Sequence, residues 1–160
     1  MSSTPEPSRR TLSFHTMSDI ANEVDALDQS GVETIGGWSP AQNLEHVTRA
    51  MDFSLDGFDF KAPIPLRYIA PLMKNKFLKG GFNPGIKLTG DFAKAFTPPD
   101  DITWDDAIMH FNRTIDRLYR GERMVQRSPL FGSMTHEDWV RLHCRHCELH
   151  FSHLHPTASA

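Results

Sequence analysis

Hydrophobic residues in this chain recur mainly at intervals of three and four, the spacing that places side chains on one face of an α-helix. The first such segment begins near Ser18, a residue type that commonly caps helix N-termini. Its apolar positions are Ile20, Val24 and Leu27, and Gly31 follows its end. The pattern therefore predicts a first amphipathic helix between these limits.

A second helix is predicted from about residue 40 to residue 58. Ser39 is placed as the N-cap, Pro40 occupies the first helical position, and Gln42 completes a capping box. The apolar stripe that follows has one clean face, formed by Leu44, Val47, Met51, Leu55 and Phe58.

The third predicted helix begins after Thr103, with Asp106 three residues further on, and runs to about Arg123. Its buried stripe is formed by Ala107, Ile108, Phe111, Ile115 and Leu118. A fourth helix begins after Thr135 and runs to about His153.

No segment alternates between apolar and polar residues in the manner of a β-strand. Four amphipathic helices predict an all-α fold, a four-helix bundle with one domain over residues 11–155. Residues 1–10 and 156–160 are expected to be disordered tails.

Residues 61–100 form a long insert between the second and third predicted helices, rich in proline and expected to be irregular. A short helix over Leu66–Leu78 is expected to break at Pro71. Residues 80–85 favour a turn. The apolar content of the insert indicates that it packs over one end of the bundle, where it would act as a lid.

Composition narrows the function classes. The 160-residue chain has a formal net charge of −3, which offers no basic surface for nucleic acid. No apolar run approaches the roughly 18 residues of a membrane span, so no membrane partner is expected. Arg9 and Arg10 are not followed by the apolar stretch of an export signal, and we therefore expect a cytoplasmic protein.

Five of the nine histidines lie between residues 143 and 155, on the fourth predicted helix and just beyond it. With Trp139 as the origin, His146 and His150 fall about 20° to either side of the same face. Two imidazoles at positions i and i+4 can bind one metal ion. His143 and His153 lie about 40° from Trp139 on the same face. The alternative to metal binding is that these are buried histidines hydrogen-bonded to neighbouring polar groups.

A third ligand is suggested by Asn43-Leu44-Glu45-His46 on the second predicted helix. Periodicity alone places His46 about 160° from the apolar stripe, where a surface residue is expected. Cys144 and Cys147 form a C-x-x-C pair, which we interpret as packed thiols rather than a redox or zinc motif.

Several segments together resemble the DinB-like superfamily, and within it a bacterial branch described as a domain of unknown function. The resemblance is carried by residues 10–14, by 37–46, by Pro84-Gly85-Ile86-Lys87-Leu88, by 129–132, and by Thr135, Trp139, Leu142, His143, His146 and His150. It covers nearly the whole chain. It implies a metal site formed by His46, His146 and His150, which reverses the periodicity argument for His46.

The superfamily includes metal-dependent S-transferases that use low-molecular-weight thiols, such as the bacillithiol transferases, and the mycothiol-dependent maleylpyruvate isomerase. The resemblance therefore implies a small-molecule substrate, a low-molecular-weight thiol, and a possible homodimer. Three imidazoles suit a divalent ion, Zn²⁺ or Ni²⁺, and leave a coordination position open. Alternatives are a metal-dependent hydrolase, a non-catalytic metal-binding or stress-related module, and a zinc site at the two cysteines.

Overall fold

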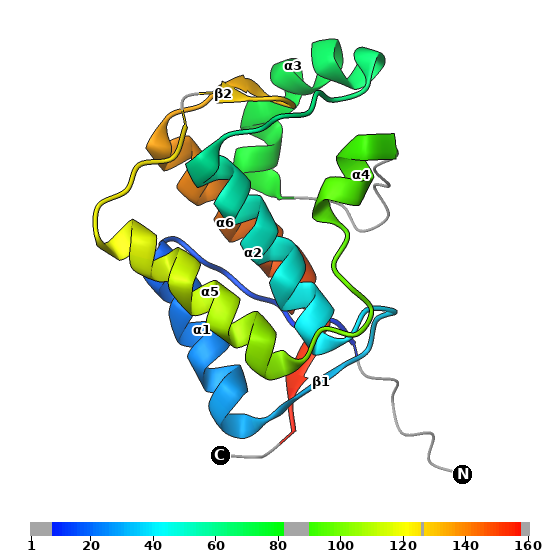
Figure 1. The fold of residues 1–160 in the computed structure, drawn as a ribbon, viewed down its shortest axis with the longest axis vertical. Helices are drawn as coiled ribbons and strands as arrows, with labels where there is room; N and C mark the ends of the chain where they lie inside the picture. Colours follow the sequence, from blue (N-terminus) through cyan, green and yellow to red (C-terminus); the bar gives the residue numbers. More distant parts are fainter. Residues whose placement is uncertain (1–7, 82–89, 126, 158–160) are drawn as a thin grey trace.

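The computed structural model describes residues 8–81, 90–125 and 127–157, which are mostly helical (Figure 1). The helices within these ranges are α1 (Met17–Ser30), α2 (Pro40–Asp56), α3 (Ile64–Gly80), α4 (Gly90–Phe96), α5 (Trp104–Tyr119) and α6 (His136–Phe151). The four helices expected from periodicity correspond to α1, α2, α5 and α6. Their predicted bounds differ from these by a few residues at the ends.

Capping side chains explain where these helices begin. Thr16, two residues before the expected Ser18, caps α1 by accepting a hydrogen bond from the Asp19 backbone N–H. Ser39 caps α2 as predicted, and its capping box with Gln42 is complete. The caps of α5 and α6 are likewise the predicted residues Thr103 and Thr135.

In the part of the chain that the structure describes, four short strands add to the helices: β1 (Val32–Thr34), β2 (Arg127–Ser128), β3 (Gly132–Ser133) and β4 (Leu154–Pro156). The sequence predicted no strands, because segments of two or three residues are too short to show an alternating pattern. β1 pairs antiparallel with β4, and β2 pairs antiparallel with β3. Both pairs flank α6, so each end of that helix adjoins a strand.

The main core lies where α2 packs against α5 and α6, and α1 packs against the same two helices (Figure 1). Its largest fully buried members include Ile20, Leu27, Leu44, Met51, Phe111 and Phe151. Burial of such side chains stabilises the fold by about 1.5–3 kcal/mol each relative to exposure. The core thereby fixes α2 against α6, the two helices that carry the candidate ligands.

The expectation of an irregular insert is wrong for the described part of residues 61–100, which contains α3 and α4. α3 continues through Pro71 instead of breaking there. Ala70 and Leu78 are buried in a cluster shared with α6, and the Lys74 ammonium bonds Asp138 on α6. These contacts offset the hydrogen bond that proline cannot donate. The turn expected at residues 82–85 and the motif at 84–88 lie outside the described residues.

α4 packs on α2 through a third apolar cluster, in which the buried Phe92 and Phe96 contact Phe53 and Phe60. The contact places the C-terminal end of α4 over the side of α2 that carries His46. This side of α2 is therefore covered by protein.

The terminal segments are ordered further than expected. The Arg10 backbone N–H donates to the Ser152 carbonyl oxygen at 2.8 Å, and Val32 of β1 pairs with Pro156 of β4. Arg10 and Pro156, the innermost residues of the two expected tails, thus make backbone contacts with the helical body. Among the helices described, none combines the length and apolar character needed to cross a membrane.

Candidate metal centre

Three histidines from two helices converge at one point between α2 and α6. His46 is buried on α2, and His146 and His150 are partly buried on α6. One ring nitrogen of each lies within 4.8 Å of the others. His46 Nε2 and His146 Nε2 are 3.0 Å apart. The structure thus brings together the three residues that the sequence singled out as candidate ligands.

The local fold explains the position of His46, for which the periodicity argument was wrong. Every residue from 41 to 48 is buried, so this part of α2 has no solvent-facing side. α5 and α6 cover much of this segment, and α4 covers the side with His46. A single apolar stripe cannot describe a helix that is enclosed on several sides.

A backbone carbonyl orients the His46 ring. Nδ1 of His46 lies 2.8 Å from the Phe96 carbonyl oxygen, which only accepts hydrogen bonds. Nδ1 must therefore carry the proton, which leaves the lone pair of the neutral ring on Nε2, the nitrogen that faces His146. Metal-binding histidines are commonly fixed in this way by a carbonyl or carboxylate on the second nitrogen.

Trp38 covers the cluster from the side of the loop before α2. Its ring stacks on His150 with centroids 6.0 Å apart and an interplanar angle of 18°, and its centroid is 5.0 Å from that of His46. The indole therefore shields two of the three imidazoles and limits their rotation.

Burial keeps the three imidazoles neutral. It lowers the pKa of His150 to about 3, and it lowers the pKa of His46 below its ordinary value. The pKa of His146 falls well below 6.5, mainly through burial and further through the neighbouring histidines. Neutral rings at pH 7 offer the lone pairs that a metal ion requires.

The separation of two of the donor nitrogens is close to that expected around a tetrahedral ion. Two nitrogens that each lie about 2.0–2.1 Å from zinc at a tetrahedral angle are separated by about 3.3 Å. The observed 3.0 Å between His46 and His146 is close to that value.

Two further histidines on or just beyond α6, His143 and His153, contact other groups. His143 is fully buried, and its Nε2 lies 2.9 Å from the Ser54 hydroxyl oxygen. Burial lowers the pKa of His143 to about 3. His153 lies beyond the end of α6 and packs beside Gly36. The histidine-rich face is therefore divided between a candidate metal site and a core hydrogen bond.

Cys144 and Cys147 belong to the main apolar core and not to the histidine cluster. Burial raises the pKa of the Cys144 thiol to about 11 and that of Cys147 well above 9.0. Both are therefore protonated at neutral pH, and a thiol must lose its proton to bind zinc. This agrees with the interpretation of the pair as packed thiols.

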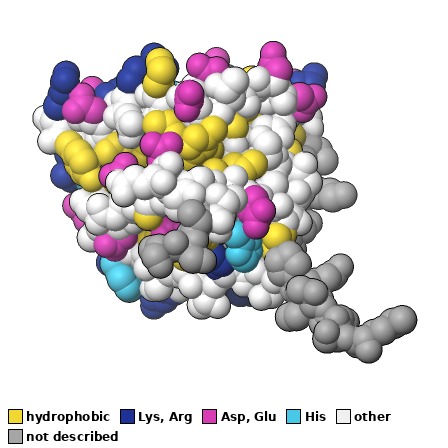
Figure 2. All heavy atoms as spheres, turned by 90° about the horizontal axis from the view of Figure 1, so that it is seen from below, with side chains coloured by type: hydrophobic (Ala, Val, Ile, Leu, Met, Phe, Trp, Pro, Cys, Tyr) yellow, Lys and Arg dark blue, Asp and Glu magenta, His cyan; other side chains and the backbone are white. Residues whose placement is uncertain are grey.

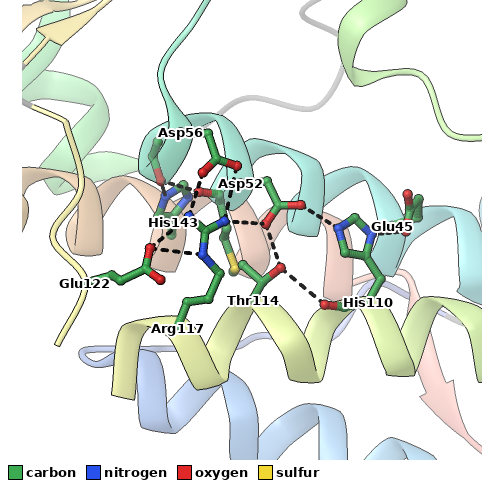
Figure 3. A network of polar contacts seen from close by, with 10 residues as sticks. Glu45, Asp52, Asp56, His110, Thr114, Arg117, Glu122 and His143 are labelled. Atoms are coloured by element: carbon green, nitrogen blue, oxygen red, sulfur yellow. Dashed lines mark hydrogen bonds and ion pairs between the residues drawn. The ribbon is translucent and has the colours of Figure 1, made fainter. Parts of the chain in front are cut away.

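A polar network between α2 and α5, which the sequence analysis missed, lies next to the cluster (Figure 3). His110 Nδ1 bonds Glu45 at 2.8 Å, and its Nε2 bonds Asp52 at 2.5 Å. Asp52 also accepts a hydrogen bond from Thr114 at 2.7 Å. Arg117 pairs with Asp56 at the end of α2 and with Glu122 just beyond α5. The only available signal was a polar stripe on the third helix at positions 110, 114 and 117.

These hydrogen bonds, above all the one with Asp52, raise the pKa of His110 against the effect of burial. For Asp52, burial acts to raise the pKa, but the bonds from His110 and Thr114 outweigh it and leave the pKa lowered. The network is therefore a set of ion pairs that locks α2 against α5. Since Glu45 adjoins His46, it also fixes the backbone that presents this ligand.

An open depression of about 440 Å³ is lined by residues of the segment Asp52–Asp59 at the C-terminal end of α2. None of the three clustered histidines lines it. The chemistry at the cluster is therefore separate from this acidic depression.

Fold and site together define a mostly helical protein with three neutral histidines gathered between two of its helices. A family model described as "protein of unknown function (DUF1569)" matches residues 6–157, and the chain belongs to that family. No curated protein and no solved structure matches the chain.

Proposed function

We propose that the protein binds one divalent transition-metal ion through His46, His146 and His150. The observation that carries this proposal is the approach of three ring nitrogens to within 4.8 Å, from helices whose ligands are 100 residues apart in sequence. An all-nitrogen donor set suits Zn²⁺ or Ni²⁺.

We propose further that the site is catalytic and that it serves a metal-dependent transfer of a small thiol to an electrophile. Three protein ligands leave a position open, as in catalytic rather than structural zinc sites. A bound ion would supply Lewis-acid chemistry that lowers the pKa of a thiol or water at that position. Hydrolysis with water as the nucleophile is the alternative outcome at the same site.

The chain's own residues support this role in two ways. The Phe96 carbonyl holds His46 in the tautomer that directs Nε2 into the cluster, and Trp38 restricts access of water to His46 and His150. The arrangement of α1, α2, α5 and α6 is compatible with a DinB-like four-helix bundle, in which α3 and α4 would form the lid.

Metal content after expression and dialysis tests the binding proposal. Wild-type protein should retain about one equivalent of zinc or nickel by elemental analysis. His46→Ala and His146→Ala should each weaken binding more than about tenfold, because even changes to the hydrogen-bond partners of metal ligands cost about 10–100-fold in affinity. His153→Ala is the matched control, because it removes a histidine just beyond the same helix without touching the cluster, and it should bind as wild type does.

Two results would overturn the binding proposal: wild-type protein that takes up no divalent ion, or equal losses from His153→Ala and His146→Ala. Conjugation of small thiols to a chromogenic electrophile tests the catalytic proposal. Activity should be lost when a chelator removes the metal, return when the metal is added back, and be lost with His146→Ala. Turnover that proceeds without thiol would instead identify a hydrolase.

A further inference from the structure

α3 exposes an unusual amount of apolar surface for a helix that is packed on its protein. Within the described residues, six large apolar side chains are more than half exposed, and four of them lie on α3. These are Ile64, Tyr68, Ile69 and Leu72, of which Leu72 is 87% exposed. Monomeric proteins seldom gather such side chains in one place unless the surface binds something.

The four side chains form one ridge. Ile64, Tyr68 and Leu72 are spaced at i, i+4 and i+8, so successive members are displaced by only about 40° around the helix. The buried Ala70 lies on the other side of α3, about 160° around the helix from Tyr68. It packs with α6 in the same cluster as the buried Leu78, which lies nearer the C-terminal end of α3. In Figure 1, α3 lies at the upper end of the molecule, well away from α1 and α5. The ridge therefore points away from the protein body.

The segment that carries this ridge is basic. Between residues 61 and 80 the chain has five basic residues and no acidic residue, although its net charge is −3. Lys61 precedes the apolar side chains, and Lys76 and Lys79 follow them, all three exposed. By contrast, acidic side chains lie among the apolar ones on the face shown in Figure 2.

We propose that α3 is a docking surface for anionic phospholipid bilayers. The apolar ridge would enter the interface between headgroups and acyl chains, while the lysines at its two ends bind lipid phosphates. This is peripheral attachment by a helix lying on the membrane, a mode that does not require the apolar length of a spanning helix. It is independent of the metal proposal.

Charge and shape favour a lipid surface over other occupants. In a two-fold symmetric dimer through α3, the same basic residues of both copies would face one another. An acidic protein partner would neutralise the lysines, but it would need a groove that fits a protruding ridge. A fluid headgroup layer accommodates protruding side chains without a preformed groove.

Co-sedimentation with lipid vesicles tests the proposal on the full-length protein. Wild type should bind vesicles of phosphatidylcholine mixed with phosphatidylserine, and binding should weaken with salt. Leu72→Glu should reduce binding about tenfold or more. Lys76→Glu combined with Lys79→Glu should have a similar effect, since each basic residue near such a surface contributes about 1 kcal/mol.

Met109→Glu is the matched control, because Met109 on α5 is 59% exposed but lies outside the basic segment. It should leave binding unchanged. Circular dichroism verifies that each variant is folded. Vesicles of pure phosphatidylcholine are tested beside the mixed vesicles. The proposal is overturned if wild type binds neither kind of vesicle or binds both equally well. It is also overturned if Met109→Glu and Leu72→Glu reduce vesicle binding to the same extent. A dimer that Leu72→Glu dissociates, without vesicle binding, would assign the ridge to a second copy.

Discussion

Replacement of His110 by alanine tests whether the network between α2 and α5 stabilises the fold. The imidazole bonds two carboxylates on α2, Glu45 at 2.8 Å and Asp52 at 2.5 Å (Figure 3). Its raised pKa indicates a protonated ring at moderately acidic pH, so both bonds are charge-assisted. Hydrogen bonds to charged groups contribute about 1.5–3 kcal/mol each.

Partial exposure reduces this figure. The His110 side chain is 22% exposed, and that of Asp52 is 29% exposed, so solvent screens the pair. Glu45 keeps a second partner in Arg49 at 3.0 Å. We therefore expect His110→Ala to lower the free energy of unfolding by about 2–3 kcal/mol in total. For a chain of this length the midpoint temperature should fall by about 5–10 °C.

The stabilisation by His110 should depend on pH in a defined direction. A histidine whose pKa is raised on folding contributes its full stabilisation below its unfolded value of 6.5. That contribution is lost as the pH rises through the raised value. At acidic pH, the lowered pKa of Asp52 keeps its carboxylate charged, so the ion pair between His110 and Asp52 persists to a pH below 3.8. The difference in free energy of unfolding between wild type and His110→Ala should thus be greatest between about pH 4 and 6.5.

Urea unfolding followed by circular dichroism, at about pH 6 and about pH 9, measures this difference. Met109→Ala changes a neighbouring exposed residue and should alter stability by less than about 0.5 kcal/mol. A His110→Ala effect as small as that of the control would refute the reasoning. An effect of equal size at both pH values would show that packing, rather than charge, is responsible.

Three further predictions concern the core. Phe151→Ala should destabilise the protein by about 3–5 kcal/mol in thermal or urea unfolding, because the wild-type ring is fully buried; a loss below about 1 kcal/mol would contradict this. His143→Gln should flatten the decline in stability between pH 6.5 and about 3, since burial lowers the pKa of His143 to about 3 and only the unfolded state is protonated in that window. Cys144 and Cys147 should react with a thiol reagent only after denaturation, and rapid labelling of the native protein would show that they are accessible.

Helix starts were the most predictable part of the fold, because they depend on local chemistry. Ser39, Thr103 and Thr135 each cap the helix for which they were proposed. The course of α3 could not be predicted in this way. Pro71 indicates a break when only neighbouring residues are considered, and the contacts that keep the helix intact come from α6, more than 60 residues further along the chain.

The candidate site was predictable in its residue types but not in its surroundings. Spacing placed His146 and His150 on one face. The segment Asn43–His46 suggested His46 as a third ligand, but periodicity assigned it to the surface, and only the resemblance reversed that assignment. Its burial depends on α4, a helix that no pattern indicated. The Phe96 carbonyl is a backbone group, which no side-chain motif can reveal.

Trp38 places an intrinsic fluorophore beside the candidate metal site. This indole stacks on His150 and lies near His46, whereas Trp104 bonds Asp28 and Trp139 bonds a carbonyl oxygen elsewhere. Emission from Trp38 should consequently respond when a quenching cation such as Ni²⁺ occupies the cluster, while the other two indoles supply a steady background. Site occupancy in the native chain can then be followed in real time, with no label attached.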